Sequence, residues 1–218
     1  MRTRVKICGI TRVADGIAAA QAGADAIGLV LWSGSPRCVS FDTARAIAEA
    51  APPFVSVVGL FVDPDPAQVR AALAAIPLSL LQFHGSESAE LCRSFGRPYI
   101  KAVPVAQNAG SAGLLECVAH HPDAAGFLFD APPSGGMPGG TGEAFDRSLV
   151  PKGLGRPVIL SGGLDAANVR EALRIVRPWA VDVSSGVEAL YADGTTVKGI
   201  KDPARIGAFI EEVRNADG

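Results

Sequence analysis

The chain has 218 residues, 48% of them hydrophobic, and a formal net charge of -2. This length and apolar content suit a single α/β barrel domain over residues 1–218, a fold that typically needs about 200–250 residues. The near-neutral charge leaves no electrostatic footprint for nucleic acid or an anionic membrane. No apolar run approaches the roughly 20 residues of a membrane span, so we expect neither of these partners.

The cysteines and histidines argue against disulfides and against a metal site. The residues concerned are Cys8, Cys38, Cys92, Cys117, His84, His120 and His121. The cysteines lack a CxxC pair or a regular framework, which favours reduced thiols in a cytosolic protein, and no histidine has ligand spacing with a cysteine. The N-terminus lacks the apolar region of a signal peptide. We therefore expect a cytoplasmic protein without a metal.

Strand-like and helix-like segments alternate along the chain. Strand-like apolar runs begin near Val5, Ala26, Phe54, Ser79, Tyr99, Gly126, Val158 and Ala180. Helix-like stretches are Val13–Ala22, Asp42–Ala51, Pro66–Ile76, Glu87–Phe95, Leu114–His120, Asp165–Ile175 and Asp202–Asn215, and a short one is expected after Glu143. Eight units of about 25 residues, without GxGxxG after the first strand, favour a closed (β/α)8 TIM barrel over an open doubly wound sheet.

Five residues are predicted to mark helix ends. Thr11 and Asp165 suit N-caps, and Pro66 suits a first helical position. Gly23 and Gly96 suit helix exits, where the backbone often turns left-handed.

Two glycine-rich turns follow the last two predicted strands. They are Gly162-Gly163 and Ser184-Ser185-Gly186. Backbone N–H groups on such turns bind phosphate, and barrels of this fold bind phosphate after strands 7 and 8. Either turn alone is consistent with an ordinary tight turn. Together they predict a phosphate site and a small phosphorylated substrate.

Catalytic groups of such barrels come from the carboxyl ends of strands. Cys8 ends the first strand, and alternation places Lys6 on the same face. If that face is the barrel interior, Lys6 would favour the thiolate of Cys8 and make it a base or nucleophile; the alternative is an inert core thiol. Asp130 ends the sixth strand, as a general acid or as a cap of its own loop.

Three further polar residues and one loop also follow strands. Arg37, behind Pro36, either binds a carboxylate bidentately or remains a solvated charge. His84 is a hydrogen-bonding group of the pocket or a structural histidine, and Asp182 is expected to be structural, bonded to backbone or lysine. The glycine- and proline-rich loop 131–141 is either a mobile lid or an exposed linker.

Several motifs together make the chain similar to a known family. They are Val5-Lys6-Ile7-Cys8-Gly9-Ile10-Thr11, Ser35-Pro36-Arg37, Gly59-Leu60-Phe61-Val62, Leu81-Gln82-Phe83-His84-Gly85, Gly139-Gly140-Thr141-Gly142, Ser161-Gly162-Gly163-Leu164 and Asp182-Val183-Ser184-Ser185-Gly186-Val187-Glu188. From residue 5 to around residue 210 the sequence resembles the phosphoribosylanthranilate isomerases of tryptophan biosynthesis. The first and last motifs are specific, whereas the Gly-Gly-Leu turn fits many barrels.

The resemblance implies a (β/α)8 barrel that needs no cofactor and catalyses an Amadori rearrangement. N-(5-phosphoribosyl)anthranilate would become 1-(2-carboxyphenylamino)-1-deoxyribulose 5-phosphate. Cys8 would be the general base at ribose C2, and Asp130 the general acid at the ring oxygen. Arg37 would hold the anthranilate carboxylate, and Gly162-Gly163 and Ser184-Ser185-Gly186 the phosphate. Whether the chain is a monomer or a homodimer stays open.

Two positions depart from the family pattern. Arg147 stands where a tryptophan is common, which is expected to alter packing near the loop. Phe83 stands where leucine is more usual, and we expect only a change in the core there.

Other activities on the same fold compete with this interpretation. A metal-dependent pentose-phosphate epimerase needs strand-end ligands, and His84 is the one strand-end histidine. Indole-glycerol-phosphate synthase needs catalytic lysines, for which Lys6 and Lys101 are candidates, but no strand-end glutamate supports them. A silent phosphate sensor would not need both Cys8 and Asp130. Activity on a related aminoaldose phosphate remains open.

Overall fold

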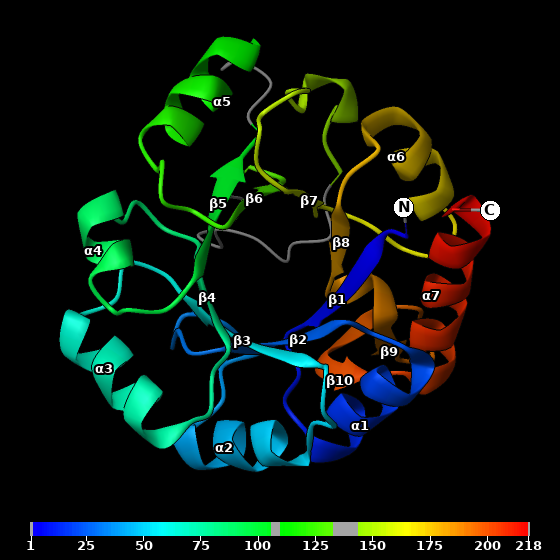
Figure 1. Cartoon of the computed structure of the whole chain (residues 1–218). Coiled ribbons are helices and arrows are strands. Elements are labelled where there is room, and N and C mark those ends of the chain that lie inside the picture. Colours follow the sequence, from blue (N-terminus) through cyan, green and yellow to red (C-terminus); the bar gives the residue numbers. More distant parts are fainter. Residues whose placement is uncertain (1, 106–109, 133–143, 218) are drawn as a thin grey trace.

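Eight parallel strands form a closed ring with helices around it (Figure 1). The computed structural model describes residues 2–105, 110–132 and 144–217. The strands are β1 Arg4–Cys8, β2 Ala26–Val30, β3 Ser56–Phe61, β4 Leu80–Phe83, β5 Tyr99–Pro104, β6 Gly126–Asp130, β7 Val158–Leu160 and β8 Ala180–Val183. The ring closes where β8 pairs with β1, from Arg4 beside Ala180 to Ile7 beside Val183. The predicted (β/α)8 barrel is confirmed.

The helices occupy the predicted stretches, with shifted ends. They are α1 Val13–Ala22, α2 Phe41–Ala50, α3 Pro66–Ala75, α4 Ala89–Arg93, α5 Gly110–Ala119, α6 Val169–Val176 and α7 Pro203–Asp217. The weakly marked unit after β6 contains the 3-10 turn η1, Arg147–Leu149, so the expectation of a short element is confirmed. A second 3-10 turn, η2, covers Ser185–Val187.

The predicted helix ends were right at two positions and wrong at three. Pro66 begins α3, and Gly23 ends α1 with a φ of 102°. Gly96 has a φ of 63°, but it lies beyond the end of α4. Thr11 does not cap α1, because its hydroxyl donates to the carbonyl oxygen of Gly199 at 2.5 Å. Asp165 accepts hydrogen bonds in the turn before α6 and is not that helix's N-cap.

An antiparallel hairpin, which the sequence reading missed, lies between β8 and α7. Its strands are β9 Glu188–Leu190 and β10 Thr196–Lys201. Figure 1 places it outside the ring, on the side of α1 and α7. The Asp193-Gly194 pair between the strands was the available signal, since Asp-Gly is typical of tight hairpin turns.

The apolar residues form one core outside the ring and another inside it. Between strands and helices lie large side chains such as Phe83, which is fully buried 6.1 Å from the Phe61 ring centroid, as expected of a core change. Inside the barrel, a small apolar cluster includes Leu128 and Ala180. Strand alternation puts polar side chains two residues further along on the same face, where Asp130 and Asp182 stand. At its carboxyl end the inside of the barrel is therefore polar on the side of β6 and β8, and a further small apolar cluster includes Val30 and Leu60.

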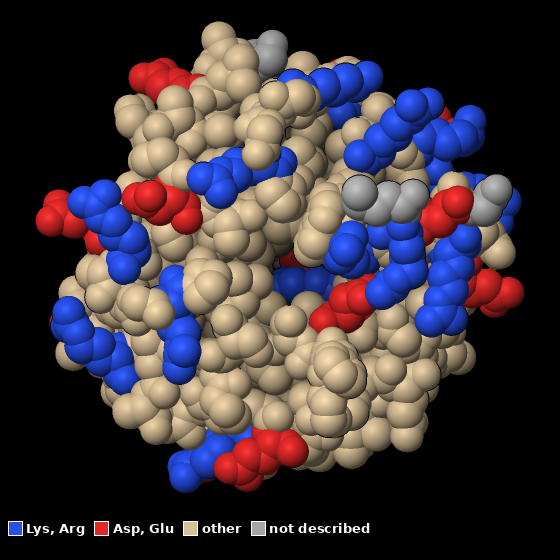
Figure 2. Space-filling view, viewed as in Figure 1, with Lys and Arg blue, Asp and Glu red and all other residues tan. Residues whose placement is uncertain are grey.

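The charged surface is mixed in sign. On the face shown in Figure 2, Lys and Arg side chains are interspersed with Asp and Glu among larger areas of other residues. Within the described ranges no helix is long and apolar enough to cross a membrane.

Candidate active site

A pocket opens at the carboxyl end of the barrel strands. Its polar lining includes Cys8, Arg37, His84, Asp130, Asp182 and Ser184. The empty space is about 500 Å³, counting the part open to solvent. Side chains from β1, β4, β6, β8 and the loop after β2 thus meet at one place.

Cys8 and Lys6 point into the barrel together, as predicted from strand alternation. Lys6 Nζ donates to Asp182 Oδ1 at 2.8 Å, so the structural role expected for Asp182 is confirmed. Gly28 on β2 makes room for them, because a Cβ there would lie 2.8 Å from Cys8 Sγ and 3.1 Å from Lys6 Nζ. A glycine inside a strand often marks such a close approach, but the sequence analysis did not identify Gly28 as part of the site.

The protonation of Cys8 depends on burial and on Asp182 as well as on Lys6. Burial raises the pKa of the Cys8 thiol, the Lys6 ammonium lowers it, and the Asp182 carboxylate raises it again, with a net upward direction. Lys6 thus favours the thiolate, as predicted, but burial and Asp182 outweigh its effect in the free protein. Asp182 keeps the pKa of Lys6 above its usual value despite burial, so that ammonium is already paired.

Asp130 meets a histidine across the pocket. Its Oδ1 accepts from the N–H of Ala131 at 2.8 Å, so it does cap its own loop. Its Oδ2 lies 3.3 Å from His84 Nε2, and the other ring nitrogen of His84 lies 2.9 Å from the amide nitrogen of Gln82. The pocket therefore holds a Gln82–His84–Asp130 chain of polar contacts, and His84 is a hydrogen-bonding group of the pocket.

The two glycine-rich turns lie against one another. A Cβ on Gly186 would fall 1.9 Å from the carbonyl oxygen of Leu164, the residue after Gly162-Gly163. Gly162 has a φ of 82° and Gly163 a φ of 58°, a conformation that side chains disfavour. Among the described residues, the N–H groups of Gly162 and Gly163 form no hydrogen bond with another backbone group. Their backbone donors can therefore serve one ligand group.

Arg37 lines the pocket and forms an ion pair with Glu188, which was not predicted from the sequence. Its Nε donates to Glu188 Oε1 at 2.7 Å, and its Nη2 to Oε2 at 2.9 Å. Arg37 is only 3% exposed, so the alternative of a solvated charge is wrong. Burial acts to raise the pKa of Glu188, but the hydrogen bond from Arg37 and the charge of Lys201 bring it below its usual value.

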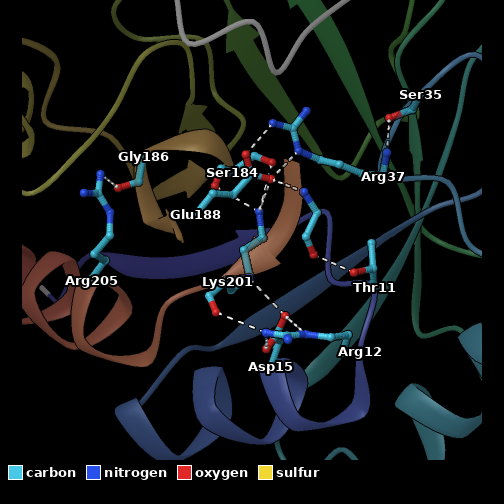
Figure 3. A network of polar contacts seen from close by, with 11 residues as sticks. Thr11, Arg12, Asp15, Ser35, Arg37, Ser184, Gly186, Glu188, Lys201 and Arg205 are labelled. Atoms are coloured by element: carbon cyan, nitrogen blue, oxygen red, sulfur yellow. Dashed lines mark hydrogen bonds and ion pairs between the residues drawn. The ribbon is translucent and has the colours of Figure 1, made fainter. Parts of the chain in front are cut away.

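Lys201 at the end of β10 completes a buried network around this glutamate (Figure 3). Its Nζ lies 2.9 Å from the carbonyl oxygen of Ser184 and 3.2 Å from Glu188 Oε1. Its backbone N–H donates to Asp15 of α1 at 3.0 Å. The hairpin thereby connects the loop after β2 with the turn after β8. Neither Glu188 nor Lys201 was among the predicted site residues.

Two sequence-based predictions concern the loop after β6 and its surroundings. Residues 133–141 of the predicted lid lie outside the described residues. Arg147 is half-buried, and its Nε and Nη2 have no hydrogen-bond partner among the described residues. Burial lowers the pKa of Arg147, although the charges of Asp165 and Glu171 oppose this. Arg147 belongs to η1, which packs against α6. The expected change in packing near the loop stays a prediction.

No cluster of potential metal ligands occurs within residues 2–105, 110–132 and 144–217. The closed barrel, with a thiol, a carboxylate and two glycine turns at its mouth, defines an enzyme of the (β/α)8 class. The family described as N-(5'phosphoribosyl)anthranilate (PRA) isomerase matches residues 5–212, and the chain belongs to this family of isomerases. The resemblance read from the motifs is confirmed.

Individual relatives agree over the whole chain. The N-(5'-phosphoribosyl)anthranilate isomerase of Halorhodospira halophila is 54% identical over 217 residues, which are 100% of this chain and 99% of that protein. A solved isomerase in complex with reduced 1-(o-carboxyphenylamino)-1-deoxyribulose 5-phosphate is 36% identical, with a TM-score of 0.80 over 98% of this chain and 99% of its own. Monomers generated from the dimeric isomerase of Thermotoga maritima are 34% identical, with the same TM-score and coverage.

Proposed function

We propose that this pocket isomerises N-(5-phosphoribosyl)anthranilate to 1-(2-carboxyphenylamino)-1-deoxyribulose 5-phosphate, a step of tryptophan biosynthesis, with Cys8 as base and Asp130 as acid. The observation that carries the proposal is their convergence: both line one pocket, from β1 and β6, between the arginine and the glycine turns. An acid and a base that face one bound substrate are what the rearrangement requires.

The substrate is anchored at both ends. Its phosphate binds the N–H groups of Gly162-Gly163 and Ser184-Ser185-Gly186, which adjoin at the Leu164 carbonyl. Its anthranilate carboxylate binds the guanidinium of Arg37, which lines the same pocket. Anchors at both ends fix the ribose between Cys8 and Asp130, which removes much of the entropic cost of reaction.

The chemistry begins with opening of the ribose ring. Asp130 gives a proton to the ring oxygen as the bond from C1 to that oxygen breaks, and the nitrogen lone pair forms an iminium with C1. The Cys8 thiol loses its proton to solvent, and the thiolate then takes the proton from C2. The electrons of that C–H bond move to form the C1–C2 double bond and neutralise the nitrogen. The resulting enaminol tautomerises to the ketone.

The raised pKa of Cys8 fits this order of events. In the free pocket the thiol is neutral, because burial outweighs the Lys6 ammonium. The iminium adds a positive charge beside the sulfur, and an adjacent opposite charge favours the thiolate. The base is therefore activated when its substrate has become acidic.

The wider assignments follow from the same family. We place the enzyme in the cytoplasm, as one (β/α)8 domain acting on a small phosphorylated molecule. It acts as a monomer or a homodimer; the dimeric origin of the Thermotoga maritima relative supports the second state.

The test is loss of catalysis without loss of binding. Cys8→Ala and Asp130→Asn should each lower kcat by at least about 10²-fold, the scale of acid–base catalysis, while affinity for the reduced product analogue stays close to that of the unaltered enzyme. Activity is followed as the fluorescence decrease of freshly made phosphoribosylanthranilate. Cys92→Ala, which removes another buried thiol, is the matched control.

Retention of more than about a tenth of kcat would remove the altered residue from its role. An unaltered enzyme that turns over a related aminoaldose phosphate as fast as phosphoribosylanthranilate would overturn the substrate assignment while leaving the acid–base pair in place.

A further inference from the structure

Two cations hold the back of the turn that follows β8. Lys201 Nζ donates to the carbonyl oxygen of Ser184 at 2.9 Å, and Arg205 Nη2 donates to that of Gly186 at 3.0 Å. Figure 3 shows both contacts, the first reaching the turn from β10 and the second from α7. The carbonyls at both ends of the turn are therefore bound on the side of the hairpin and the last helix.

The geometry of the peptide bond gives these contacts a consequence. The described backbone contains no cis peptide bond, and in a trans peptide the C=O and the next N–H point in opposite directions. When Lys201 binds the Ser184 carbonyl, the N–H of Ser185 must point away from Lys201. When Arg205 binds the Gly186 carbonyl, that oxygen is turned away from an anion on the opposite side.

We propose that Lys201 and Arg205 are positioning residues that orient the Ser184–Gly186 turn so that its N–H groups, and not its carbonyl oxygens, face the substrate phosphate. This inference rests on the proposed function, which puts the phosphate at this turn. A hydrogen bond from a cation to a carbonyl also polarises the attached peptide and strengthens its N–H as a donor. Neither residue needs to touch the phosphate.

The cost of burying Lys201 supports a functional role. Its side chain is fully buried, and removing an ammonium from water is expensive even when it is paired. Well-packed apolar residues in place of a buried ion pair often stabilise a protein as well or better. Fold stability alone therefore does not explain an ammonium behind a phosphate-binding turn.

The experiment compares phosphate discrimination between variants. Dissociation constants of the reduced product analogue and of its dephosphorylated form are measured by calorimetry for the unaltered enzyme, K201M and R205M. Their ratio should fall about tenfold or more in K201M, the effect of losing a charged hydrogen bond, and by a smaller factor in R205M. KM for the substrate should rise, while kcat at saturation changes little.

A matched control separates positioning from general damage. K101M also removes a buried lysine that binds two carbonyl oxygens and a buried glutamate, but these lie around Gly85, away from the turn. It should leave the ratio of the two dissociation constants unchanged. Arg205 is half-buried at the start of α7, so R205M decides the question if K201M does not fold.

The outcomes are distinguishable. Equal affinity of the unaltered enzyme for both analogues would overturn the phosphate site, and the positioning role with it. Discrimination in the unaltered enzyme that the folded variants keep would overturn the positioning role alone. An equal loss in K101M would make the effect one of stability.

Discussion

Two buried lysine–glutamate pairs stand behind the barrel mouth on different sides. Lys101 of β5 lies 3.0 Å from Glu87 and holds the carbonyl oxygens on either side of His84. Lys201 of β10 lies 3.2 Å from Glu188 and holds the carbonyl oxygen of Ser184. Each lysine thus fixes a loop that reaches the pocket.

The pairs differ in what else their carboxylates bind. Glu87 accepts from the backbone N–H groups of Asp63 and Gly85, which carry no net charge. Glu188 accepts from Arg37, so two cations share one carboxylate. The Lys101 cluster is formally neutral and the Lys201 cluster formally positive. Of these two clusters, the one with surplus positive charge lies on the side where we propose that two anionic groups of the substrate bind. Binding of these anions explains why two otherwise similar clusters differ in charge.

Removing the carboxylates should reveal this difference as the largest effect on stability. Glu188→Gln removes the carboxylate that two buried cations share, and breaking a buried pair costs about 3–5 kcal/mol. Glu87→Gln leaves one lysine, so its loss in the free energy of unfolding should be smaller. Urea unfolding of both variants measures this. Equal losses would mean that the additional cation on Glu188 does not matter for stability.

The pH dependence of stability should come next in size. Burial lowers the pKa of Lys201 from 10.5 to about 8. The charge of Arg37 lowers this pKa further, whereas Glu188 and Cys8 raise it. Between these values the unfolded chain keeps a proton that the folded chain has lost, so stability rises with pH, by at most about 1.4 kcal/mol per unit. The free energy of unfolding, measured in urea, should therefore rise with pH more steeply for the unaltered protein than for K201M.

The difference between the two proteins is needed because other groups titrate in this range. The buried thiols of Cys8 and Cys92 have raised pKa values and ionise first in the unfolded chain, which lowers stability above about pH 9 in both proteins. If the difference in unfolding free energy between the two proteins did not change between pH 8 and 10.5, burial would not lower the pKa of Lys201.

Arg37 tests whether the positive surplus serves the carboxylate. Arg37→Ala should weaken binding of the reduced product analogue by about 1.5–3 kcal/mol, the range for a charged hydrogen bond. Glu188 keeps Lys201 and the N–H of Gly199 in this variant, so the fold should survive. Arg37→Lys should restore only part of the affinity, because an ammonium cannot reproduce the planar fork. An analogue without the anthranilate carboxylate is the control, and an equal loss with it would assign Arg37 elsewhere.

The sequence predicted the parts of this site that depend on position along a strand. Strand ends and following turns carry Cys8, Asp130 and the glycines, and the barrel brings strand ends together whatever the rest of the chain does. The Lys201 cluster could not be found this way. Arg37 and Glu188 are 151 residues apart, and Lys201 belongs to a hairpin outside the eight repeats.

One wrong prediction and one incomplete prediction have the same origin. Thr11 is a good local cap, but a carbonyl 188 residues away takes its hydroxyl. Lys6 does share a face with Cys8, but the effect of its charge is set by burial and by Asp182, neither of which a two-residue period reveals.

The smallest expected effect comes from the edge of the Lys201 cluster. Thr11→Val removes the hydroxyl that donates to the Gly199 carbonyl at 2.5 Å and keeps the shape of the side chain. One neutral hydrogen bond is worth about 1 kcal/mol, which urea unfolding should detect. Phosphate discrimination should not change, because the backbone N–H of Lys201 still binds Asp15 and its Nζ still binds Ser184. If Thr11→Val lost as much discrimination as K201M, the turn would depend on the placement of the whole hairpin, and the ammonium behind it would be incidental.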